Sequence, residues 1–179
     1  MPSNSGTKHE SRFYPAVKSA LEDLFKKRGL NCQFDILGNC RPPKELLKAT
    51  NPKLLRYRNV LPSPDVMGFV WGRNFSLRKL IIAEFKETPR FRDIFQTKGY
   101  HELFNARLSL IVCKIPLSES SKSAMAYLQI DPCLLKTRRT KIYCALLNRI
   151  REGKVVLANL ASEPEFDFFT EIDGMEREL

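Results

Sequence analysis

An unbroken apolar run at residues 80–83 leads directly into Glu84 and Lys86, and it constrains this chain more than any other feature. Short runs of this kind, rich in β-branched residues, are typical of a strand covered on both faces of a sheet. Side chains two positions apart on a strand point to the same face, so Glu84 and Lys86 lie side by side at its end. Burying an acid and an ammonium there is unfavourable unless the pair is used. The run therefore predicts a central strand at residues 77–86 with a site at its end.

A second strand is predicted just before it, at residues 65–71, and it begins with Asp65 behind a proline. Residues 72–76 are typical of a turn, so a hairpin would bring Asp65 to Glu84. Two carboxylates beside a lysine are ligands suited to Mg²⁺ or Mn²⁺, which would bind a phosphate oxygen and acidify a water. Lys86 would then orient or deprotonate that water. The alternative is a surface ion pair of Glu84 with Lys86, with Asp65 used as a turn cap.

The rest of the chain alternates helices and strands, which predicts an α/β protein with a mixed sheet flanked by helices. We expect a flexible tail at residues 1–10, one domain at 11–161 and an acidic tail at 162–179. Gly99 lies within a predicted helix, where close packing would explain a glycine. The expected helices are 13–25, 44–49, 89–105 and 143–150, the last closing at Gly153, and the remaining strands are 32–37, 108–113 and 155–160.

The charge balance favours a polyanionic partner. Lys and Arg number 30 against 20 Asp and Glu, a net charge of +10, and nucleic acid is the commonest partner of such a chain. The basic segment 40–60 is either an insertion that touches a phosphate backbone or a solvated loop. No apolar run is long enough for a membrane helix, and the five cysteines form no C-x-x-C pair, so we expect reduced thiols, no membrane and a cytoplasmic location.

The sequence Pro64-Asp65, followed by Glu84-Phe85-Lys86 at the end of an apolar strand, resembles the PD-(D/E)xK nuclease superfamily. The resemblance implies a restriction-endonuclease-like fold with an αβββαβ core, and a Mg²⁺-dependent (or Mn²⁺-dependent) deoxyribonuclease. It implies that Asp65, Glu84 and the backbone carbonyl of Phe85 are metal ligands and that Lys86 is the catalytic lysine. An additional acid on the first helix would be Glu10.

The spacing Gln96-x-x-x-Tyr100 resembles the RecB-like branch of that superfamily, in which these residues shape the site and contact DNA. Positions four apart lie on one helical face, so the two side chains would act together. Five basic residues are candidates for holding the DNA backbone, namely Arg90, Arg92, Lys98, Arg138 and Arg139.

Two alternatives remain open on the same fold. One is a non-catalytic nucleic-acid-binding protein, and the other is a subunit of a larger nuclease or repair assembly. The resemblance also allows a homodimer. The sequence contains no Gly-rich phosphate loop and no Gly-x-Ser-x-Gly elbow, which argues against the nucleotide-binding and hydrolase classes that depend on them.

Overall fold

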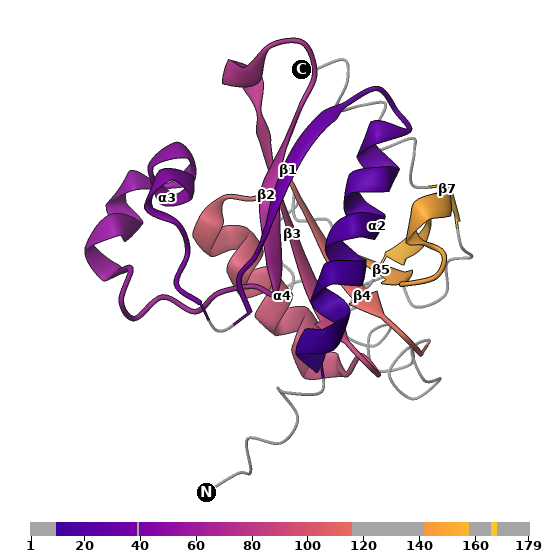
Figure 1. The fold of residues 1–179 in the computed structure, drawn as a ribbon. Coiled ribbons are helices and arrows are strands. Elements are labelled where there is room, and N and C mark those ends of the chain that lie inside the picture. Colours follow the sequence, from indigo (N-terminus) through magenta and orange to yellow (C-terminus); the bar gives the residue numbers. More distant parts are fainter. Residues whose placement is uncertain (1–9, 39, 116–141, 158–165, 168–179) are drawn as a thin grey trace, which may run out of the picture.

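The computed structural model describes residues 10–38, 40–115, 142–157 and 166–167 (Figure 1). It is an α/β protein built on one mixed sheet, as the sequence predicted. Its elements, in chain order, are η1 (Ser11–Phe13), α2 (Tyr14–Lys26), β1 (Asn31–Ile36), α3 (Lys44–Thr50), η2 (Pro52–Tyr57), β2 (Val66–Trp71), η3 (Phe75–Leu77), β3 (Lys79–Lys86), α4 (Phe91–Phe104), β4 (Leu108–Cys113), β5 (Ile142–Leu146), η4 (Ile150–Glu152), β6 (Lys154–Leu157) and β7 (Phe166–Asp167).

The strands lie in the sheet in the same order as in the sequence, from β1 to β7. β1, β2 and β3 are antiparallel neighbours, whereas β4 runs parallel to β3 and β5 runs parallel to β4. The parallel step from β3 to β4 requires a crossover connection, and α4 supplies it. β3 therefore lies inside the sheet, with the predicted site residues at its carboxyl end.

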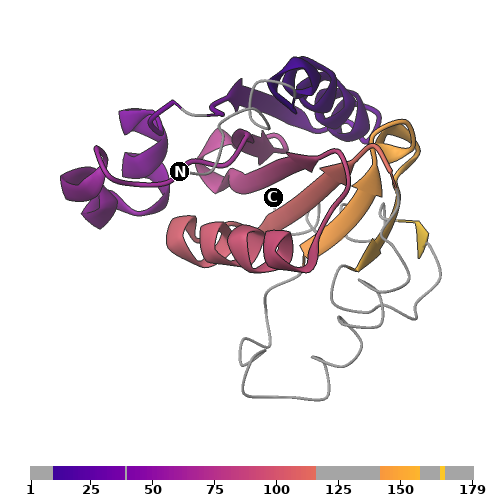
Figure 2. The same cartoon turned by 90° about the horizontal axis from the view of Figure 1, so that it is seen from below.

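Helices cover both faces of the sheet, with α2 on one face and α4 on the other (Figure 2). The α2 face buries alternate residues of β3, Ile81, Ala83 and Phe85, together with Leu21 and Phe25 of the helix. The opposite face buries Leu80 and Ile82 with Tyr100 and Phe104 of α4. By this alternation, Glu84 and Lys86 face α4, which explains why a helix residue such as Tyr100 comes near them.

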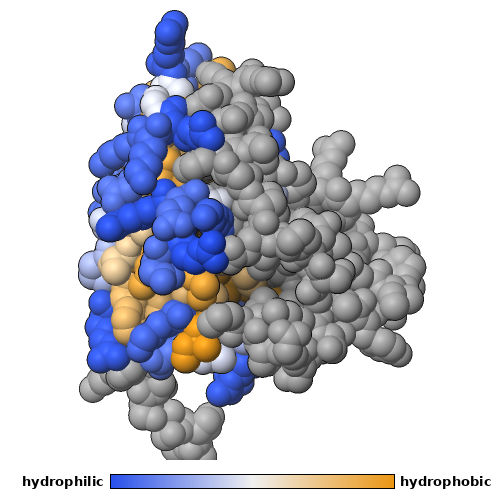
Figure 3. Space-filling model, turned by 90° about the vertical axis from the view of Figure 1, so that its right-hand side faces the viewer, coloured by the Kyte–Doolittle hydropathy of each residue, from blue (hydrophilic) through white to orange (hydrophobic). Residues whose placement is uncertain are grey.

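The basic segment between β1 and β2 forms α3 and η2, which lie beside the sheet (Figures 1 and 2). Leu46 and Leu47 of α3 are buried in the core on the α4 face, so this segment is anchored and is not simply a solvated loop. Hydrophilic side chains cover most of the described surface seen in Figure 3, around a smaller apolar area. No described helix has the length and apolarity needed to span a membrane.

One predicted helix is wrong. Residues 142–146 form strand β5, and a single 3-10 turn, η4, follows before Gly153 ends it with a φ of 74°. Ile142, Tyr143 and Cys144 are all buried, because β5 lies beside β4 and is covered on both faces. A strand buried on both faces shows no alternation, so its apolar residues can match a helical spacing by chance.

Two further expectations concern glycine and the termini. A Cβ built on Gly99 would meet nothing within 4 Å, so close packing does not explain this glycine. Residues 166–167, inside the segment expected to be an acidic tail, pair with β6 as the short strand β7. The expected flexible tail falls almost wholly outside the described residues, which begin at Glu10.

The four described cysteines, Cys32, Cys40, Cys113 and Cys144, are free thiols.

Candidate active site

The register of the β2–β3 hairpin brings Asp65 to Glu84. Val66 pairs with Ala83, so Asp65, one residue before the strand, lies opposite Glu84. The Phe85 backbone N–H donates a hydrogen bond of 2.8 Å to Asp65 Oδ2. Asp65 is 7% exposed and Glu84 is 1% exposed, so both carboxyl groups are withdrawn from water. The sequence prediction that these two acids converge is consistent with this geometry.

Lys86 lies next to the two acids. Its Nζ is 3.5 Å from Glu84 Oε2, and its side chain is only 16% exposed. Glu84 Oε1 is buried and has no hydrogen-bond partner in the part of the chain that the structure describes. A buried polar atom without a partner is destabilising by about 1–3 kcal/mol, and more if charged. The site therefore has one carboxylate oxygen that no described donor satisfies.

The electrostatics of the site follow from two acids and one cation in a desolvated space. Burial raises the pKa of Glu84 well above its usual value. The charge of Asp65 and a side-chain hydrogen bond with it raise the pKa further, and Lys86 opposes this. Burial lowers the pKa of Lys86, but the negative charges of Glu84, Asp65 and Glu10 have the larger effect, so the pKa of Lys86 is raised overall. Two carboxylates thus face one ammonium, and an additional cation would relieve their repulsion.

Tyr14, which the sequence analysis did not single out, belongs to the same site. Burial raises the pKa of its phenol, and a side-chain hydrogen bond with Asp65 raises it further. The backbone of Asp65 is also fixed, since its carbonyl accepts from Leu37 N (2.8 Å) and Gly38 N (3.1 Å). Gly38 has a φ of +49°, and a Cβ on it would come within 3.0 Å of the Tyr14 ring. The turn after β1 therefore leaves room for the tyrosine that holds Asp65.

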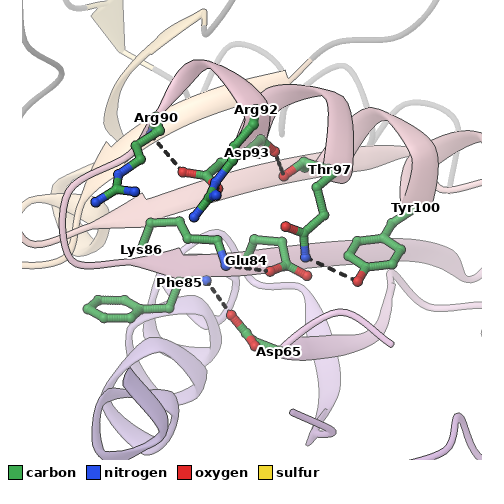
Figure 4. Close-up of polar contacts among 10 residues, drawn as sticks. Asp65, Glu84, Phe85, Lys86, Arg90, Arg92, Asp93, Thr97 and Tyr100 are labelled. Atoms are coloured by element: carbon green, nitrogen blue, oxygen red, sulfur yellow. Dashed lines mark hydrogen bonds and ion pairs between the residues drawn. The ribbon is translucent and has the colours of Figure 1, made fainter. Parts of the chain in front are cut away.

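Gln96 and Tyr100 of α4 are a bonded pair, with Gln96 Nε2 donating to Tyr100 Oη over 3.2 Å. Burial raises the pKa of Tyr100, and the charge of Glu84 raises it further. The phenol therefore lies close enough to Glu84 to sense its charge. In Figure 4, Glu84, Lys86 and Tyr100 direct their polar groups into the space between β3 and α4, and the Asp65 carboxylate lies at the edge of β3, bonded to the Phe85 N–H.

Glu10 immediately precedes η1 and is partly buried. Its charge acts on both Lys86 and Tyr14. However, the described residues contain no group of three or more His, Cys, Asp or Glu side chains that could hold a metal ion. Glu10 is thus near the site but does not form such a group with Asp65 and Glu84. The ligand set expected from the sequence, two carboxylates and the Phe85 carbonyl, includes only two side chains of this kind.

Basic side chains occur at the start of α4. Asp93 accepts from Arg90 N at 2.6 Å and so caps the helix, while the Arg92 side chain is 77% exposed and 3.9 Å from Asp93. Figure 4 shows the side chains of Arg90 and Arg92 on the side of α4 that faces Lys86 and Glu84. Both can therefore attract an anion toward the site.

The other three predicted DNA contacts have different outcomes. Lys98 lies two residues after Gln96, roughly 200° further around the helix. Its Nζ pairs with Glu102 at 3.7 Å, so it is not brought to the Gln96–Tyr100 side. Arg138 and Arg139 lie outside the described residues.

No family model matches the chain, and no curated protein sequence matches it.

Proposed function

We propose that this protein is a metal-dependent nuclease that hydrolyses phosphodiester bonds of DNA. The observation that carries the proposal is the buried group of Asp65, Glu84 and Lys86, in which Glu84 Oε1 has no described partner. The elements follow the order α2, β1, β2, β3, α4, β4, and the two acids lie at the open end of the β2–β3 hairpin, away from its turn. This arrangement supports a restriction-endonuclease-like fold. The net charge of +10 suits a polyanionic substrate.

The donor set fits a hard divalent cation. Asp65, Glu84 and the backbone carbonyl of Phe85 would hold it, because Mg²⁺ and Mn²⁺ prefer oxygen ligands. When bound, Mg²⁺ or Mn²⁺ supplies Lewis-acid activation of a phosphate oxygen and of a water. The fit rests on Glu84 Oε1, which is buried and unsatisfied, and on the repulsion between the two acids.

The chain's own residues have separate roles in this proposal. Lys86, held beside Glu84, orients the attacking water and stabilises negative charge that develops on the phosphate. Tyr14 and the Phe85 N–H fix the orientation of the Asp65 carboxylate. The Gln96–Tyr100 pair closes the site on the α4 side. Arg90 and Arg92 hold the phosphate backbone without reading the sequence.

The test is cleavage of labelled linear, single-stranded, flapped and four-way DNA with Mg²⁺ or Mn²⁺. Wild type is compared with Glu84→Gln, Lys86→Ala and a matched control, Glu102→Gln, which changes an exposed glutamate of α4. We expect metal-dependent cleavage that Glu84→Gln and Lys86→Ala abolish and Glu102→Gln retains. Cleavage that survives both site substitutions would contradict the proposal.

A non-catalytic nucleic-acid-binding role is the second candidate, and the net charge of +10 favours it. It predicts that wild type binds DNA but cuts none of the four substrates with either metal. It also predicts that Glu84→Gln leaves the affinity for DNA unchanged.

A further inference from the structure

A cluster of basic residues lies at the far end of α4 from the candidate active site. There a pocket of about 280 Å³ is lined by Thr50, Phe69, Arg78, Lys79 and Arg107, among others. Three of its lining side chains are cationic and none is acidic. A pocket with this charge attracts an anion, and a phosphate group is the anion whose oxygens match arginine and lysine donors.

Arg78 is held in place by aromatic rings. Its guanidinium carbon lies 4.9 Å from the centre of the Phe69 ring and 4.5 Å from that of Phe75. Phe75 in turn packs edge-on against Trp71, with ring centres 5.0 Å apart. Stacking fixes the plane of the guanidinium and leaves its N–H edge able to donate, so binding a phosphate loses less side-chain entropy. Phe75 is 52% exposed and offers a ring face on which a base can stack.

One exposed side of α4 runs between this pocket and the candidate active site. Arg92, Phe95, Gln96 and Gly99 are all exposed and lie on one side of the helix. Gly99 is unfavourable in mid-helix by about 1 kcal/mol relative to alanine, and nothing within 4 Å of its Cβ position requires it. A glycine is favoured where a ligand must approach the helix backbone closely.

We infer that the pocket of Arg78, Lys79 and Arg107 binds a phosphate of a nucleic-acid strand that runs along α4, past Gly99, to the candidate active site. This inference rests on the proposed function, whose substrate it extends. On β3, Lys79 of the pocket lies five residues before Glu84, which is about 17 Å at about 3.3 Å per residue. At about 3.4 Å per step of one duplex strand, the two sites are about five nucleotides apart. Figure 1 shows the β2–β3 hairpin, which carries Arg78, extending past the end of α4.

Binding is measured without metal, so that the result does not depend on cleavage. The probes are fluorescein-labelled DNA of 20 and of four nucleotides, followed by anisotropy in EDTA at several salt concentrations. The variants are Arg78→Gln, Arg78→Lys and Gly99→Gln. The control is Ala16→Gln, an exposed position of α2 on the opposite face of the sheet. Thermal unfolding of each variant verifies that it is folded.

We expect Arg78→Gln to weaken binding of the 20-nucleotide probe about tenfold and to reduce its salt slope by about one, with little effect on the four-nucleotide probe. Arg78→Lys should restore part of the affinity. Gly99→Gln should raise the melting temperature by about 2–3 °C yet weaken binding at least threefold, and Ala16→Gln should leave affinity unchanged. A purely structural role for Gly99 would not move stability and affinity in opposite directions.

Three results would overturn the inference: unchanged affinity in Arg78→Gln, equal losses for both probe lengths, or a Gly99→Gln variant that binds as wild type does. Inorganic phosphate is a second probe. If phosphate raises the melting temperature of wild type but not of Arg78→Gln, and DNA binding does not change, the pocket binds a free phosphate and not a strand. Failure of cleavage alone would reject the proposed nuclease and leave this binding result intact.

Discussion

Glu84→Gln should stabilise the metal-free protein at neutral pH. The carboxylate is 1% exposed and one of its oxygens has no partner in the described part of the chain. Its pKa is raised even with the favourable contribution of Lys86 included, so the neutral form is the one that the fold prefers. An amide has the same shape without the charge. Removing a buried charge that Lys86 only partly compensates is worth about 2 kcal/mol, within the usual range for a poorly satisfied buried group. For a chain of this size that corresponds to a rise of about 4–8 °C in melting temperature.

The effect should depend on pH in a defined direction. A carboxyl group whose pKa is raised on folding stabilises the fold fully below its unfolded pKa, and that contribution is lost as pH rises through the folded pKa. Near the ordinary glutamate value of 4.5, wild-type Glu84 is therefore largely protonated and resembles glutamine. The difference in melting temperature between Glu84→Gln and wild type should be largest at pH 7.5 and should shrink toward zero near pH 4.5.

Thermal unfolding followed by circular dichroism in EDTA, at pH 4.5, 6 and 7.5, measures this difference. Glu102→Gln serves as the control, because an exposed i,i+4 ion pair with Lys98 contributes only about 0.3–0.5 kcal/mol. A melting temperature of Glu84→Gln below that of wild type at pH 7.5 would refute the reasoning, because it would mean that the charged carboxylate stabilises the fold. A gain of the same size at pH 4.5 would also refute it.

Three other outcomes follow from the same geometry. Mg²⁺ or Mn²⁺ at 100 times the dissociation constant should stabilise the wild type by about 2.7 kcal/mol and so raise its melting temperature, but should not stabilise Asp65→Asn or Glu84→Gln, as differential scanning fluorimetry would detect. Tyr14→Phe removes one hydrogen bond to Asp65, so it should lower the rate of DNA cleavage while reducing the free energy of unfolding by only about 0.5–1.5 kcal/mol. Cleavage kinetics measure the first effect and denaturant unfolding the second, and an unchanged cleavage rate would refute the role of Tyr14 in holding Asp65. Gly38→Ala should be destabilising by about 1–2 kcal/mol, because φ is +49° and the new methyl would meet the Tyr14 ring; wild-type stability in urea unfolding would argue against this contact.

Predictions from the sequence were most accurate for strands whose hydrophobic pattern alone decides the secondary structure. β4 has the expected bounds, and β2 and β3 differ from the prediction by one or two residues. The approach of Asp65 to Glu84 followed from the hairpin alone, because the pairing of two adjacent strands is a local property of the chain. The wrong prediction, a helix at β5, concerns a strand whose burial comes from β4, which lies about thirty residues earlier in the chain.

Tyr14 and Lys98 show what local reasoning misses. Tyr14 fits the apolar side of α2, and only the position of that helix over the sheet directs its phenol to Asp65. No sequence pattern records that position. Lys98 was grouped with Arg90 and Arg92 because it is near them in sequence, but a helix turns about 100° per residue and places it elsewhere. For Lys98 the helical period alone indicates a different side of α4 from Gln96, and its contact with DNA stays a prediction.

Two unfavourable features lie on and beneath α4. Beneath the helix, Glu84 is buried with an oxygen that has no described hydrogen-bond partner; within the helix, the exposed Gly99 reduces helix stability without any packing reason. Local rules of folding favour neither, and sites that bind ligands are where such exceptions are expected. In the proposals above, a bound cation would pair with Glu84, and a nucleic-acid strand would use the space over Gly99. A metal-bound nuclease with its substrate along α4 accounts for both features, whereas a protein that only binds nucleic acid accounts for Gly99 and leaves Glu84 unexplained.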